Sequence, residues 1–81
     1  MDKYRSAILA LLKERDLGKT ICPSEVLLPE QKKDPRLMEA VRESARRLAD
    51  DGEIEITQKG EIVNPHNIKG PIRLRLRRDT K

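Results

Sequence analysis

The stretch DPRLMEAVRESARRLADDGEIEIT, residues 34–57, decides the fold, because the spacing of its core-facing residues changes once along its length. Asp34 suits the cap of a helix, and Pro35 suits the first helical position. After Gly52 the spacing of apolar residues becomes two, which is typical of a half-buried strand. The stretch therefore predicts a helix over residues 35–51 followed directly by a strand over residues 53–58. The residues that share one face of this helix are Leu37, Met38, Val41, Ser44, Ala45 and Leu48.

Upstream of this stretch the sequence predicts two further helices and one short strand. The first helix is expected over residues 2–16, with Asp2 as its cap and Gly18 just beyond its end. Residues 20–21 can form one rung of a strand. A short helix is then expected over residues 23–28, because one proline suits its start and another follows its end.

Downstream of the stretch the sequence predicts an antiparallel hairpin. Lys59 and Gly60 indicate a turn, and residues 61–63 can return as a short strand. A polar loop over residues 64–70 leads to residues 71–77, where polar and apolar residues alternate. The core-facing residues there are Ile72, Leu74 and Leu76, and the outward-facing residues are Arg73, Arg75 and Arg77.

The order of these elements predicts one α+β domain over residues 1–81. Short connections make the three helices neighbours, and the hairpin must cover the apolar face that they leave open. We therefore expect a three-helix winged helix–turn–helix with a C-terminal antiparallel β-hairpin as its wing.

The composition restricts both the core and the class of ligand. The chain has one Tyr and no Phe or Trp, so its core must be aliphatic and it lacks the stacking platforms of single-strand binders. The net charge is +4, and residues 68–81 hold six of the basic side chains against one acid, Asp79. One cysteine allows no intrachain disulfide, and we expect a cytoplasmic protein. We expect no signal peptide and no membrane-spanning run.

Six short blocks along the chain occur in the order of a known family. They read ICPSEV at residues 21–26, RLM at 36–38, VR at 41–42, ARRL at 45–48, ITQKG at 56–60 and GPIRL at 70–74. These blocks resemble the bacterial family called domain of unknown function 3253. The resemblance covers almost the whole chain and implies a small winged-helix-like domain without an assigned function. In one place the chain departs from the pattern: the family usually has a Trp before the second block, where this chain has Pro35.

The exposed face of the long helix is the first candidate for nucleic-acid binding. In a helix–turn–helix it would be the recognition helix, and arginine suits both guanine edges and phosphates. The alternative is a solvated surface in which Glu39 pairs with Arg36 or Arg42, and Glu43 with Arg46 or Arg47. The candidate contact residues on and around this helix are Lys33, Arg36, Arg42, Arg46 and Arg47, with Lys59 and Lys69 from the turn and loop of the wing.

The arginine row of the last strand has two interpretations as well. Arg73, Arg75 and Arg77 share one face and could follow a phosphate backbone. They could instead pair across the sheet with Glu53 and Glu55, which share a parity on the neighbouring strand. We favour the structural pairing.

The sequence contains no recognisable catalytic or metal constellation. Cys22 stands between an apolar residue and a proline, as a small core residue does, and His66 is alone in a polar loop. We therefore expect no enzyme, cofactor, metal, membrane contact or small-molecule substrate. Two functions remain open: weak binding of double-stranded DNA, or a protein–protein module whose partner is another protein or a second copy of the chain.

Overall fold

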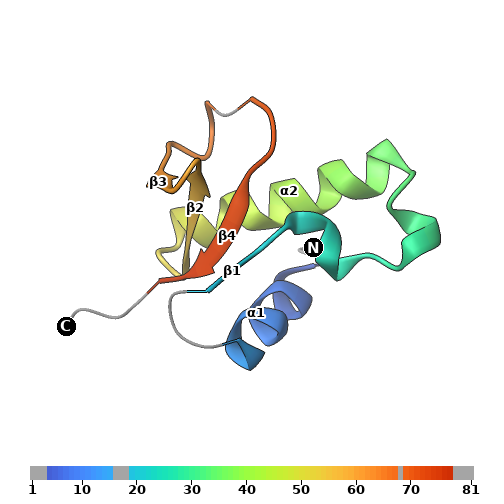
Figure 1. Ribbon diagram of the computed structural model, residues 1–81, viewed down its shortest axis with the longest axis horizontal. Helices are drawn as coiled ribbons and strands as arrows, with labels where there is room; N and C mark the ends of the chain where they lie inside the picture. The colour runs from blue at the N-terminus through green and yellow to red at the C-terminus, as the bar shows by residue number, and fades with distance from the viewer. Residues whose placement is uncertain (1–3, 16–18, 68, 78–81) are drawn as a thin grey trace.

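The structure is a computed structural model that describes residues 4–15, 19–67 and 69–77. These residues form two α-helices, two 3-10 helices and four strands. Figure 1 shows α2 running behind the sheet, with α1 below it. The elements in chain order are α1 (Arg5–Glu14), β1 (Thr20–Ile21), η1 (Pro23–Val26), η2 (Pro29–Gln31), α2 (Pro35–Asp50), β2 (Ile54–Gln58), β3 (Glu61–Ile62) and β4 (Arg73–Leu76).

The sheet is antiparallel and has the strand order β1-β4-β2-β3. The last strand therefore lies in the middle, between the first strand and β2. The expected α+β class is confirmed, but the elements are not three α-helices closed by a terminal hairpin. The predicted strand at residues 20–21 adds a fourth strand, because Ile21 pairs with Leu74 far along the chain.

Helix α2 begins where its sequence predicts. The side chain of Asp34 accepts a hydrogen bond of 2.9 Å from the backbone N–H of Arg36, and Pro35 occupies the first turn. Ser44 is buried on the core-facing side of this helix because its hydroxyl accepts a bond from the backbone N–H of Tyr4 at 3.4 Å. This contact joins the start of α1 to α2 and explains a polar side chain on a buried face.

The short helix expected over residues 23–28 is absent as an α-helix. In its place are the 3-10 turns η1 and η2, separated at Leu27 and Leu28. Pro29 cannot donate a backbone hydrogen bond, so the chain cannot continue one helix across it. The first helix is shorter than the expected 2–16, and its proposed cap Asp2 and stop Gly18 lie outside the described residues.

The β2–β3 turn follows the sequence prediction. Gln58 pairs with Glu61, which leaves a two-residue loop of Lys59 and Gly60. Both have positive φ, 54° and 83°, as the tight hairpin turn that matches the twist of a sheet requires. Lysine is an uncommon residue in this conformation.

The core is aliphatic, as the composition predicts. It lies between the inner face of the sheet and the two α-helices, and its fully buried large residues are Ile8, Ile21, Val41, Leu48, Ile54, Ile56 and Leu74. Thr57 breaks the expected alternation, since it is only 3% exposed although it belongs to the outer face. The register explains this burial: Thr57 lies between Arg73 on one neighbouring strand and Ile62 on the other.

Candidate functional site

The arginines near the end of α2 are held by glutamates of the same helix. Arg46 donates to Glu43 at 2.8 Å and also to Glu39, and Arg47 donates to Glu43 at 3.4 Å. The hydrogen bond from Arg46, followed by that from Arg47, lowers the pKa of Glu43, and the bond to Glu43 raises the pKa of Arg46. The expected pairing of Glu43 is therefore confirmed. Glu39 pairs with Arg46, two turns away, and not with the two arginines that we expected.

The other two arginines of α2 have different surroundings. Arg42 donates to the backbone carbonyl of Gly70 at 3.1 Å and so connects α2 to the loop before β4. Arg36 has a 92% exposed side chain and lies 3.7 Å from the carboxylate of Asp34. Lys33 and Arg36 stand at the beginning of α2, whereas Figure 1 shows the β2–β3 hairpin above the other end of the helix. The structure thus does not bring Lys33 and Arg36 together with Lys59.

The arginine row of β4 is divided among three environments. Arg75 lies opposite Glu55 and donates two hydrogen bonds to it, which confirms one of the predicted cross-strand pairs. Glu53 instead lies 3.9 Å from Arg5, on the side of α1. Arg77 lines a cavity beside β2. The row is therefore not a uniform phosphate-tracking stripe.

Neither Arg73 nor Arg77 forms the predicted pair with a glutamate in the described residues, and Arg73 instead contacts β1. Its Nε donates to the hydroxyl of Thr20 at 2.8 Å, and a terminal nitrogen donates to the Thr20 carbonyl at 3.2 Å. Its register partner is Thr57, not a glutamate. The sequence already indicates that one arginine must lack a partner, because the row has three arginines and the neighbouring strand offers only two glutamates on the same face.

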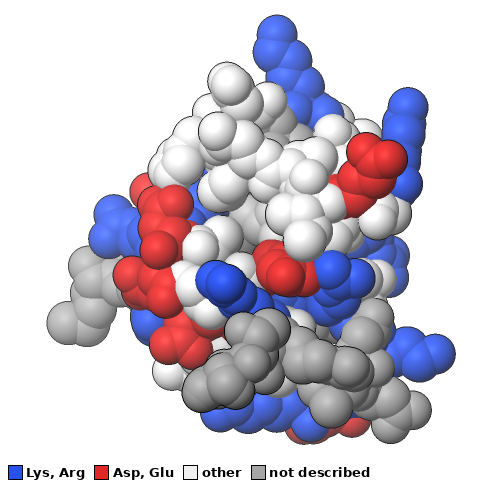
Figure 2. Space-filling model, turned by 90° about the vertical axis from the view of Figure 1, so that its left-hand side faces the viewer, with Lys and Arg blue, Asp and Glu red and all other residues white. Residues whose placement is uncertain are grey.

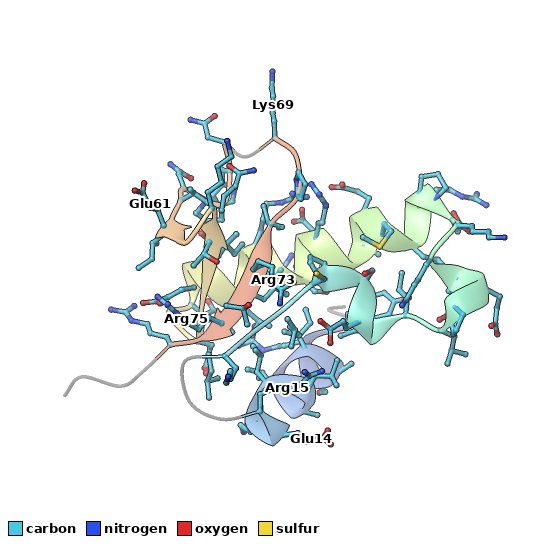
Figure 3. The ribbon with its side chains drawn as sticks, in the orientation of Figure 1. Glu14, Arg15, Glu61, Lys69, Arg73 and Arg75 are labelled. Carbon is cyan, nitrogen blue, oxygen red and sulfur yellow. The ribbon has the colours of Figure 1, made fainter. Side chains whose placement is uncertain are left out.

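Three cations come from the β2–β3 turn, the loop before β4 and the start of β4; we call Lys59, Lys69 and Arg73 the hairpin-end cluster. The side-chain amide of Gln58 donates to the carbonyls of Lys69 and Pro71, which fastens the loop against β2. Within the described residues none of the three forms an ion pair with a carboxylate. In Figure 3 Lys69 points away from the protein at the top, while Glu61 lies at the left beside β3.

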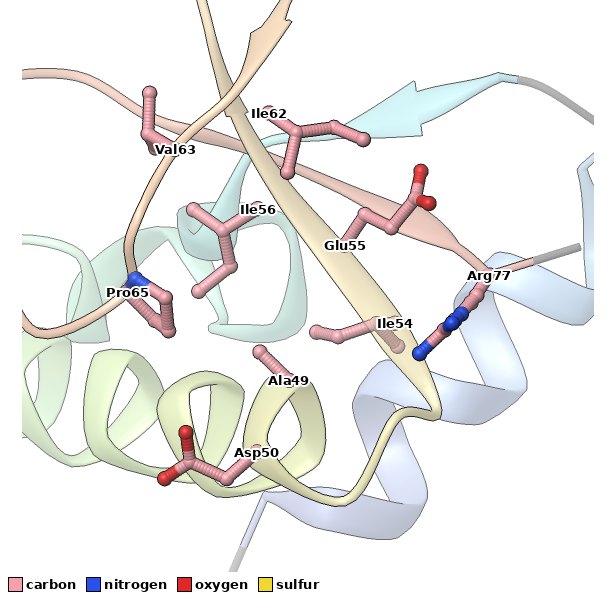
Figure 4. A pocket seen from close by; sticks show the side chains of 9 residues that line it. All are labelled: Ala49, Asp50, Ile54, Glu55, Ile56, Ile62, Val63, Pro65 and Arg77. Carbon is pink, nitrogen blue, oxygen red and sulfur yellow. The ribbon is translucent and has the colours of Figure 1, made fainter.

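A cavity of about 470 Å³ lies on the other side of β2, between β3 and the end of α2. Its lining is mostly apolar, with charged groups at its margin (Figure 4). Ile62 beside it is 61% exposed. Figure 2 shows a broad uncharged area over this side of the molecule, with acidic groups along one border and basic groups above it. We call the surface around the exposed Ile62 and this cavity the β3 face.

The described residues show no ready metal or membrane feature. No group of three or more His, Cys, Asp and Glu side chains in this part of the chain could hold a metal ion. His66 lies 2.9 Å from Asp50, which gives it an ion-pair partner when protonated. None of the described helices is both long and apolar enough to span a bilayer.

Two comparisons with known proteins bear on this geometry. The model of a family described as a protein of unknown function, DUF3253, matches residues 1–77. No curated protein matches the chain significantly.

Proposed function

The chain belongs to the DUF3253 family of proteins of unknown function, and we propose that it is a non-enzymatic winged-helix module that binds the phosphate backbone of double-stranded DNA. The observation that carries this proposal is the hairpin-end cluster, whose three cations have no carboxylate partner among the described residues. Cations of this kind release counterions from a polyanion when they bind it.

The arrangement of the elements supports a winged-helix interpretation. Helix α1, strand β1, the turns η1 and η2, and helix α2 precede two strands that pair with each other. In this interpretation η1 and η2 replace the second helix, α2 is the third, and the chain from β2 to β4 is the wing. Lys59 of the hairpin-end cluster then lies at the tip of the wing.

The contacts favour binding to the backbone over reading of bases. Arg46 and Arg47 would have to leave Glu39 and Glu43 before they could contact a base edge. The absence of Phe and Trp argues against stacking on single strands. Three phosphate contacts give weak binding, with a slope of log K against log salt of roughly −2.7.

Fluorescence anisotropy of a labelled duplex, titrated at several salt concentrations, tests the proposal. We expect binding at low salt that weakens steeply as salt rises. The triple variant Lys59→Gln, Lys69→Gln, Arg73→Gln should remove most of that dependence. Binding that is indifferent to salt, or that is unchanged in the variant, contradicts the proposal.

A second candidate function is self-association through the β3 face. The specific observation is Ile62, exposed at 61% beside a largely apolar cavity on a two-residue edge strand. Sedimentation equilibrium should then show a dimer that Ile62→Gln weakens. A monomer at every protein concentration would exclude this candidate.

A further inference from the structure

A second cavity, of about 310 Å³, lies beside the hairpin-end cluster. It is formed where the end of β1 leads into η1, where β2 turns, and where the chain enters β4. Its volume is at the lower end of the range for small-molecule sites. The residues that line it are Cys22, Gln58, Lys59, Pro71, Ile72 and Arg73.

The lining combines an apolar surface with two cations. Ile72 is 5% exposed, and Pro71 and the half-buried Cys22 add further weakly polar surface. Lys59 and Arg73 supply the positive charge. An apolar body with one anionic group complements this combination, because the body removes apolar surface from water while the anion meets the cations.

Arg73 is held in position before any ligand arrives. Its Nε donates to the Thr20 hydroxyl at 2.8 Å, one terminal nitrogen donates to the Thr20 carbonyl at 3.2 Å, and the other lies 2.8 Å from the Cys22 sulfur. These contacts use three of the five N–H groups of a guanidinium. The remaining two, one on each terminal nitrogen, are available to donate to a carboxylate, an acceptor that arginine binds strongly.

Glu25 is bonded to Cys22, which lines the cavity, but its carboxylate does not pair with Arg73. Glu25 accepts a bond from the backbone N–H of Cys22 at 2.9 Å, and its other oxygen pairs with Arg15 at 2.7 Å. Both oxygens therefore already have partners. Within the described residues Arg73 and Lys59 form no ion pair, so their charge is available to a ligand.

We propose that this cavity binds a small organic carboxylate with an apolar body. The carboxylate pairs with Arg73, Lys59 adds a second positive charge, and the body lies against Pro71 and Ile72. This inference goes beyond DNA binding and does not depend on it, because the test below contains no DNA.

An NMR titration of the whole chain with 2-naphthoate tests the proposal. We expect amide shifts centred on Gln58, Lys59, Ile72 and Arg73, with a Kd on the order of 1 mM. The neutral 2-naphthamide tests the charge, and acetate tests the apolar body; each should bind at least tenfold more weakly. Equal binding of 2-naphthamide, or shifts centred on Ala49 and Ile62, overturns the proposal.

Variants separate this site from general attraction to a basic protein. Arg73→Gln should weaken 2-naphthoate binding at least tenfold, and Lys59→Gln about threefold. Lys33→Gln removes the same charge at the far end of α2 and should leave the affinity unchanged. Arg73 also contacts β1, so Arg73→Gln can fail to fold. In that case Lys59→Gln is the test, and an unchanged affinity in it overturns the proposal.

The thiol of Cys22 offers an independent measurement, since it lines the same cavity. Bound 2-naphthoate should slow its alkylation by neutral iodoacetamide at least twofold. The neutral 2-naphthamide at the same concentration should have little effect. An alkylation rate that saturating 2-naphthoate does not change places the ligand elsewhere and contradicts the inference.

Discussion

Arg46 and Arg47 on α2 contact glutamates of their own helix, whereas Lys59 and Lys69 at the hairpin end have no carboxylate partner among the described residues. Both regions are rich in positive charge, so composition alone does not separate them. Helical spacing of three and four residues keeps Glu43 beside both arginines. In the two-residue β2–β3 turn no helical spacing places a glutamate beside Lys59. Of these two regions, the hairpin is therefore the one whose lysines have no carboxylate partner among the described residues.

The largest expected effect comes from a substitution that weakens the core on which both regions are built. Leu74 is fully buried in the central strand β4, so Leu74→Ala should lower the free energy of unfolding by about 2–5 kcal/mol. Urea denaturation measures the change. The half-buried neighbour Leu76→Ala is the control and should cost less. A loss smaller than that of Leu76→Ala would contradict the central place of Leu74 in the core.

A matched pair of double variants sharpens the comparison directly. Lys59→Gln with Lys69→Gln should weaken duplex DNA binding at low salt by on the order of tenfold, because two phosphate contacts are lost. Arg46→Gln with Arg47→Gln removes the same charge from α2 and should change the affinity less than twofold. Anisotropy titrations under one buffer compare them. A larger loss in the α2 variant would place the contact surface on the helix.

Removing the glutamate partners of the α2 arginines should give both regions cations without a carboxylate partner. In Glu39→Gln with Glu43→Gln, Arg46 and Arg47 lose their charged partners and add two free cations. Duplex binding at low salt should rise about threefold, with a steeper salt dependence. Glu14→Gln with Glu30→Gln makes the same change in net charge away from these arginines and should have a smaller effect. Equal gains in DNA affinity in the two variants would show that net charge alone explains the effect.

The smallest expected effect concerns pH. Arg46 and Arg47 lower the pKa of Glu43 in the folded protein, so its pairing stabilises the fold at neutral pH. That contribution is present above the pKa of the unfolded state and is lost as the pH falls through the lower folded pKa. Thermal unfolding from pH 7 to pH 3 should therefore show a slightly weaker acid dependence in Glu43→Gln. A steeper dependence would contradict this sign. Because Glu43 is exposed to solvent, the difference should be small.

Much of the local structure was predictable because it depends on near neighbours. The cap at Asp34, the buried face of α2, the turn at Lys59 and Gly60 and the alternation around Leu74 each follow from spacing or backbone preference. The ion pairs of Glu43 are local too. The pairing of Glu55 with Arg75 needed only strand parity and the right neighbour.

The candidate sites were harder to predict because they combine distant segments. Arg73 meets Thr20 and Cys22 only because β1 pairs with β4, fifty residues or more along the chain. The sequence reasoning therefore counted Arg73 among the cross-strand pairs and treated Cys22 as a core residue.

The sequence by itself determined the α+β class, the long capped helix, the tight turn and the aliphatic core. Periodicity, capping and backbone preference act within a few residues and can be recognised in one dimension. Only the tertiary structure decided which cations remain without a partner and which residues line the cavity at Arg73. The reason is that a charge is neutralised by whatever folding brings near it, and strand order brings near residues that are far apart in the chain.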